Sequence, residues 1–173
     1  TLNPYWHVSA EMVRSLIARN TLDQGLGYLK SKGYQVMSAD GQLLDPAKVN
    51  WRAVAAGQDS VLVRQLPGPL NSMGKIKIPF PNGSDIYLHD TPTRSTFSRE
   101  RRAESHGCVR LADAKALALW LLRDVPEWPE ARVDSAIAAT KPTEVKLPAK
   151  LPVRITYATV VPSEDGTLQR FPD

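Results

Sequence analysis

The chain has 173 residues, enough for one domain with a substantial core but few for two. Its hydrophobic fraction of 42% and charged fraction of 23% are ordinary for a globular protein and argue against wholesale disorder. No apolar run approaches the roughly 18 residues that a membrane-spanning helix requires, so we do not expect this chain to span a membrane.

The formal charge of +4 and the pI near 9.3 favour anionic partners, but a charge this modest is weak evidence, and we expect no nucleic-acid partner. Cys108 is the single cysteine, which excludes an internal disulfide. No pair drawn from Cys108, His7, His89 and His106 has zinc-finger spacing, so no metal site is expected. The chain begins at Thr1 rather than Met, and we interpret it as a fragment of a longer protein.

The first third of the sequence predicts mainly helix. Ser9 can cap a helix whose apolar residues recur on one face, and a second helix is expected from position 22 or 23 to Lys32, before Gly33. A short strand is predicted at 34–37. Asp45 followed by Pro46 is typical of a helix start.

From about position 61 the pattern changes to strands and tight turns. A loop is expected over 91–104, and helices over 114–123 and 134–140, the first capped by Asp113. The predicted strands are 61–66, 75–80, 86–89, 153–161 and 167–171.

The segment Ser105-His106-Gly107-Cys108-Val109-Arg110-Leu111 carries the first chemical signal. A lone cysteine is commonly a small buried apolar residue. Here Gly107 permits a tight turn just before the sulfur, and the N–H groups near Cys108 could converge as an oxyanion hole requires. Cys108 is therefore a candidate nucleophile.

His89 closes the strand-like segment Tyr87-Leu88-His89 and is separated from Cys108 by a loop long enough for the two to meet. Histidine is the usual base for a cysteine nucleophile because its pKa lies near the working pH. A polar strand end bonded to a turn is the alternative interpretation of His89. A third group should hold the imidazole in one tautomer if it is a base.

Together these residues resemble the signature of L,D-transpeptidases with a YkuD-type catalytic domain. The phrases Phe80-Pro81-Asn82 and Tyr87-Leu88-His89-Asp90-Thr91-Pro92 resemble the large periplasmic enzymes of Gram-negative bacteria, in which a helical capping segment is inserted into the catalytic domain. Asn3-Pro4-Tyr5-Trp6 and Asp45-Pro46 fit the same subgroup. The resemblance covers nearly the whole chain.

The resemblance implies a mostly β fold with inserted helices (α+β), a YkuD-like β-sandwich. Residues 1–173 would form a single catalytic domain, with a helical capping or lid segment at about 9–57 and a catalytic core at about 58–173. Family members carry several strands before the Asn-Pro-Tyr-Trp phrase, so we expect this chain to lack the first strands of the sandwich.

The resemblance also implies roles for individual residues. Cys108 matches the nucleophile and His89 the general base, and the backbone carbonyl of Asp90 would be the third member. Gly107 and His106 match positions that shape the oxyanion turn, although His106 is also a rival base. Three further residues are expected close to substrate: Tyr87 in the donor groove, Arg110 near a substrate carboxylate, and Ser105, for which a structural hydroxyl is the alternative.

The activity implied is peptidoglycan cell-wall biosynthesis without a cofactor: acyl transfer from a tetrapeptide stem, with release of D-alanine, to the diaminopimelate side-chain amine of a second stem, forming a 3→3 cross-link. Carbapenem β-lactams would acylate the same thiol. The implied location is the periplasm, with the parent protein exported or membrane-anchored through a segment absent here. Alternatives are a Cys/His hydrolase (an L,D-carboxypeptidase or a lipoprotein-releasing amidase) and a non-catalytic wall-binding module.

Overall fold

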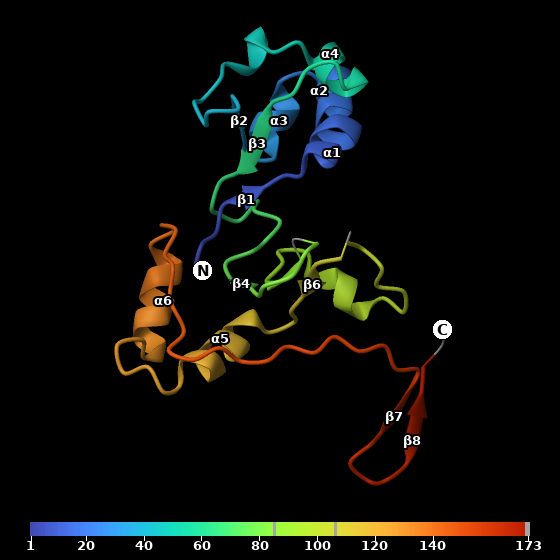
Figure 1. Ribbon diagram of the computed structural model, residues 1–173, viewed down its shortest axis with the longest axis vertical. Coiled ribbons are helices and arrows are strands. Elements are labelled where there is room, and N and C mark those ends of the chain that lie inside the picture. The colour runs from blue at the N-terminus through green and yellow to red at the C-terminus, as the bar shows by residue number, and fades with distance from the viewer. Residues whose placement is uncertain (85, 106, 172–173) are drawn as a thin grey trace.

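The computed structural model describes residues 1–84, 86–105 and 107–171. Helices make up 31% of the chain and strands 17%, divided among several sheets, so the predicted α+β class is confirmed. Figure 1 shows two lobes that follow one another along the chain and a C-terminal hairpin that projects away from both. No helix of the described residues is long and apolar enough to cross a membrane.

The first lobe packs short helices against a three-stranded antiparallel sheet of order β1-β3-β2. Its strands are β1 (Trp6–His7), β2 (Tyr34–Met37) and β3 (Leu62–Gln65). Its helical elements are α1 (Ala10–Met12), the π-helix η1 (Val13–Ala18), α2 (Arg19–Gln24), α3 (Gly27–Ser31), the 3-10 helix η2 (Pro46–Lys48) and α4 (Trp51–Ala56). The helical segment expected at 9–57 thus lies in one lobe together with the strands β1, β2 and β3.

Local signals explain most of these boundaries. The Ser9 hydroxyl accepts a hydrogen bond from the Met12 amide and so starts the first helix as predicted. The second predicted helix, however, is two helices, because the chain turns at Gly25 with a φ of 76° between α2 and α3. The core of this lobe is apolar and centred on Ile17, Val36 and Val63, which are almost completely buried.

The second lobe carries a mixed sheet of order β4-β5-β6. Its strands are β4 (Lys77–Pro79), β5 (Tyr87–His89) and β6 (Val109–Arg110); β5 runs antiparallel to β4 and parallel to β6. The 3-10 helix η3 (Arg94–Ser98) lies within the predicted loop, and α5 (Ala114–Leu122) and α6 (Glu130–Ala138) follow the sheet. Asp113 caps α5 as expected, and a separate apolar core joins these helices to the sheet through Ile76.

Two buried asparagines fix the chain segments near the junction of the lobes. The Asn71 side chain, fully buried, donates to the carbonyl oxygens of Pro4 at 2.9 Å and Leu66 at 3.0 Å, which are the two chain segments that connect the lobes. Asn3 donates to the Ala136 carbonyl oxygen at 2.8 Å, near the end of α6. The Asn-Pro-Tyr-Trp phrase therefore begins in the second lobe and ends in the first.

The strand predicted at 153–161 is wrong for most of its length. The structure has only β7 (Val160–Pro162) there, paired with β8 (Leu168–Arg170) in a separate hairpin. Alternating β-branched residues favour a strand, but a strand also needs a neighbour, and no sheet of the described residues reaches 151–158. Ile155 consequently remains 63% exposed.

Candidate active site

The site is built on β5, the central strand of the second sheet. His89 pairs with Lys77 of β4 on one side and with Arg110 of β6 on the other. Residues paired in register have their side chains on the same face, and successive residues alternate between faces. Lys77, His89 and Arg110 therefore share one face, and the opposite face carries Ile78, which packs against the core of α5 and α6.

Cys108 lies immediately before β6, at the level of Tyr87 on β5, because Val109 pairs with Leu88. It precedes Arg110 by two residues, so the alternation of the strand places it on the face that carries His89. The Cys108 side chain is half-buried. The parallel pairing of β5 and β6 thus brings the predicted nucleophile and the predicted base to one end of the same sheet.

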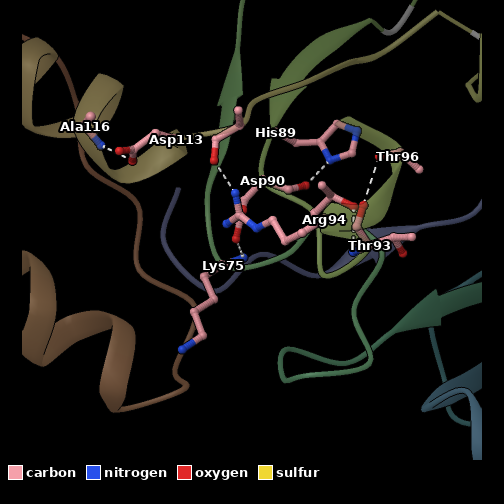
Figure 2. A network of polar contacts seen from close by, with 10 residues as sticks. Lys75, His89, Asp90, Thr93, Arg94, Thr96, Asp113 and Ala116 are labelled. Atoms are coloured by element: carbon pink, nitrogen blue, oxygen red, sulfur yellow. Dashed lines mark hydrogen bonds and ion pairs between the residues drawn. The ribbon is translucent and has the colours of Figure 1, made fainter. Parts of the chain in front are cut away.

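His89 is almost completely buried, with 3% of its surface exposed. Its Nδ1 atom lies in short hydrogen-bond contact with the main-chain carbonyl oxygen of Asp90, as Figure 2 shows. Since a carbonyl oxygen can only accept, Nδ1 carries the proton of the neutral imidazole and Nε2 has an unprotonated lone pair. The structure therefore joins the two groups expected to form the base and its orienting partner.

Burial is the main cause that lowers the pKa of His89 below its ordinary value of 6.5. The hydrogen bond to the Asp90 carbonyl oxygen raises this pKa, whereas the neighbouring cations Arg110 and Lys77 lower it. With its pKa lowered, His89 is neutral near pH 7, the form in which an imidazole can accept a proton.

The turn before Cys108 is closed by Ser105. Its hydroxyl donates to the Cys108 carbonyl oxygen at 2.7 Å and accepts from the Gly107 amide at 3.2 Å. Gly107 has a φ of 134°, and a Cβ atom there would lie 3.0 Å from Cδ1 of Ile86, so only glycine fits the position without strain. These contacts give Ser105 a structural role in the turn. His106, predicted to shape the same turn, lies outside the described residues.

Two cations flank the imidazole. The Lys77 ammonium lies over the Tyr87 ring, 3.8 Å from its centroid, and that ring meets His89 edge-on at a centroid distance of 6.0 Å. Arg110 donates to the Glu104 carbonyl oxygen at 3.2 Å. Lys77 did not emerge from the sequence as a site residue. The alternation of Lys77 with Ile76 and Ile78 predicts that its side chain lies on the face opposite to theirs. The alternation does not predict that Lys77 pairs with His89.

The Asp90 side chain is a second feature that the sequence left open. One carboxylate oxygen pairs with Arg94 at 2.7 Å, and the other accepts from the Lys75 amide at 2.9 Å (Figure 2). Gly74 leaves the room for this carboxylate, since a Cβ atom at Gly74 would lie 2.3 Å from its Oδ2. No group of three or more His, Cys, Asp or Glu side chains among residues 1–84, 86–105 and 107–171 is arranged to hold a metal ion.

The chain is similar to known proteins over nearly its whole length. A model of the YkuD family, the L,D-transpeptidase catalytic domain, matches residues 2–154. A protein of Haemophilus influenzae named "Putative L,D-transpeptidase" is 31% identical over 173 residues, which is 99% of this chain and 34% of that relative. The chain therefore spans about a third of the length of this relative.

Proposed function

Because the chain belongs to the YkuD family of L,D-transpeptidase catalytic domains, we propose that it is a peptidoglycan L,D-transpeptidase in which Cys108 is the nucleophile and His89 the general base. The observation that supports the proposal is the parallel pairing of β5 and β6, which brings Cys108 to the same end of the sheet as a buried imidazole whose Nδ1 lies against the Asp90 carbonyl oxygen. That arrangement offers a base with a defined tautomer on the strand that neighbours a half-buried thiol.

The reaction has two steps. In the first, His89 Nε2 takes the thiol proton of Cys108, and the sulfur bonds to the carbonyl carbon between residue three of a tetrapeptide stem and its terminal D-alanine. The C–N bond then breaks, His89 returns the proton to the departing nitrogen, and D-alanine leaves with a free amine. The product of this step is a thioester on Cys108.

In the second step, the side-chain amine of diaminopimelate on another stem attacks the thioester. His89 accepts a proton from this amine, the C–S bond breaks, and the proton returns to the sulfur. The product is a 3→3 cross-link and a restored thiol. The tight turn at Gly107 supports an oxyanion site beside the sulfur, formed by main-chain N–H groups. One N–H donor of this kind contributes about 3 kcal/mol of transition-state stabilisation in acyl-transfer enzymes.

Substrate recognition rests on the charge around the dyad. Stem peptides carry carboxylates on D-alanine and diaminopimelate, and Lys77 and Arg110 present positive charge on either side of His89. The Tyr87 ring, beside His89, offers an apolar wall for the donor stem. A periplasmic location belongs to the same proposal, because the wall polymer is found there.

The test is intact mass after incubation with a carbapenem, whose β-lactam carbonyl would acylate Cys108. We expect one covalent adduct on the wild type, none on Cys108→Ala, and a strongly slowed reaction for His89→Ala. His7→Ala is the matched control. His7 is also a histidine with a lowered pKa, but it is exposed and lies on β1 in the first lobe, so the acylation rate of this variant should equal that of the wild type.

Product analysis then separates transfer from hydrolysis. Incubation with disaccharide-tetrapeptides should give cross-linked dimers and D-alanine. Trimmed tripeptide monomers alone would show that water is the acceptor and would favour the hydrolase. A correctly folded wild-type protein that forms neither an adduct nor a product would defeat the proposal.

A further inference from the structure

The strand end that carries His89 is fixed by main-chain hydrogen bonds on both sides. The Leu111 amide donates to the His89 carbonyl oxygen at 2.8 Å, and the Asp90 amide donates to the Ile76 carbonyl oxygen at 2.8 Å. These bonds hold the peptide between His89 and Asp90 in the sheet. The next carbonyl, that of Asp90, lies just beyond the end of β5, and it is the group that accepts from the imidazole.

The direction of that carbonyl depends on how the Asp90 residue is anchored. Its carboxylate, on a residue 8% exposed, is held at both oxygens: by the Lys75 amide at 2.9 Å and by the Arg94 guanidinium at 2.7 Å. Gly74 shapes the pocket for it, because any side chain at that position would overlap the carboxylate. Asp90 is therefore fixed both through its amide and through its side chain.

Arg94 extends this anchor to the strand that follows the nucleophile. Its guanidinium also donates to the carbonyl oxygen of Ala112, two residues after the end of β6. The Arg94 side chain is 54% exposed, and an ion pair with that exposure contributes little to stability by itself. Its geometry is more informative, since one guanidinium ties the loop after the base to the segment after the nucleophile.

We propose that the Asp90 carboxylate and Arg94 form a positioning clamp that holds the Asp90 carbonyl oxygen against His89 Nδ1, and so sets the tautomer of the base and its alignment with Cys108. The clamp consists of Asp90, Arg94, the Lys75 amide and the Ala112 carbonyl. It touches no reacting atom. The inference rests on the proposed function, because it assigns the clamp to the base of that reaction.

Arg94→Lys and Asp90→Asn test the clamp in two ways. A lysine keeps the charge, but one ammonium lacks the planar fork that bridges Asp90 and Ala112. An asparagine keeps the shape, but one of its ends is an amide that must meet either the Lys75 amide or Arg94, donor against donor. Arg123→Gln is the matched control: its side chain is 51% exposed and paired with Asp124 at the end of α5, away from the site.

Two readouts do not depend on a peptidoglycan substrate. The first is the rate of Cys108 alkylation by iodoacetamide against pH, and the second is the ¹⁵N spectrum of the His89 ring, which distinguishes the Nδ1–H from the Nε2–H tautomer. Lys77 and Arg110, the charged groups that flank His89 from β4 and β6, are unchanged in every variant. The charge of Asp90 itself raises the pKa of His89, so the pH profile reports the clamp in Arg94→Lys, which keeps every charge, whereas the ring tautomer reports it in both variants.

We expect the wild type and Arg123→Gln to show the Nδ1–H tautomer, and both clamp variants to show a mixture with a displaced pH profile. The rate constant of acylation at saturating carbapenem should fall by about tenfold or more. The carbapenem concentration that gives half of the maximal rate should stay nearly unchanged. Either clamp variant, if folded and still showing the wild-type tautomer and pH profile, would overturn the inference. If instead the wild type performs no acyl transfer but the clamp variants change the tautomer, the proposed function fails and the clamp remains.

Discussion

The imidazole of His89 is oriented by its own neighbour in the chain: Nδ1 lies against the main-chain carbonyl oxygen of Asp90. An orienting group of this kind cannot titrate, in contrast to a carboxylate, and it needs no third side chain from a distant segment. Its position depends on the geometry of one strand end, where the Asp90 amide still bonds to the sheet. The bonds that form β5 therefore contribute to preorganising the base, together with the contacts of the Asp90 side chain.

Removing the charge of Lys77 should raise the pKa of His89. The Lys77 ammonium disfavours the imidazolium, so Lys77→Met removes a cause that lowers this pKa. The measurement is an NMR titration of His89 in a Cys108→Ala background, which isolates the imidazole from the thiol. Lys48→Met, an exposed lysine of η2 in the first lobe, controls for the loss of one positive charge. An unchanged midpoint for Lys77→Met would show that the ammonium does not act on His89.

The chemistry of the site was more predictable from sequence than its surroundings. Cys108 and His89 carry a local signal, because the motif and the strand end lie within a few residues of each atom concerned, whereas the Asp90 carbonyl was expected from the family resemblance. Lys77 and Arg94 carry none. Their relation to His89 depends on the register of β4 and on the contact of Arg94 with the segment after β6, which join distant parts of the sequence.

The fold shows the same division. The caps at Ser9 and Asp113 were predicted because a short polar side chain satisfies backbone amides within three residues. The break at Gly25 and the unpaired extended chain at 151–158 were not. The periodicity of apolar residues indicates which face of a segment would be buried. A strand, however, forms only where a second strand is available to pair with it.

Gly74→Ala should destabilise the protein by about 3 kcal/mol. A left-handed backbone costs an alanine about 1 kcal/mol, and displacing the Asp90 carboxylate from its partners adds about 2 kcal/mol. Gly41→Ala separates the two effects: Gly41 also has a positive φ, of 84°, but nothing lies within 4 Å of its Cβ position. Its cost should stay near 1 kcal/mol. Urea unfolding of both variants measures the difference, and equal losses would contradict the role of the Asp90 contact.

Gly107→Ala should slow acylation of Cys108 by about a hundredfold, because a displaced turn moves the sulfur and its neighbouring amides. A φ of 134° is strained for any residue with a Cβ atom, and Cδ1 of Ile86 adds a contact at 3.0 Å. The double variant Gly107→Ala/Ile86→Val removes that terminal carbon and leaves the backbone strain. We expect no recovery in the double variant, as measured by adduct formation on folded protein; wild-type rates would mean that crowding alone matters.

The free energy of unfolding should fall as the pH drops below about 6.5, because burial lowers the pKa of His89 in the folded protein. In the unfolded chain this histidine has its ordinary pKa. Between the two values the unfolded state binds more protons, so acid favours unfolding, and the loss ends below the folded pKa. The pKa of His7 is also lowered, first by partial desolvation and then by Arg64 and Lys77, but this side chain is exposed, so its contribution should be smaller. Urea unfolding from about pH 8 to pH 5 should therefore give a shallower slope for His89→Gln, and a still shallower one for His7→Gln/His89→Gln. If both variants leave the slope of the unfolding free energy against pH unchanged in this window, other groups take up the protons. The stability data would then give no support for a neutral, buried base.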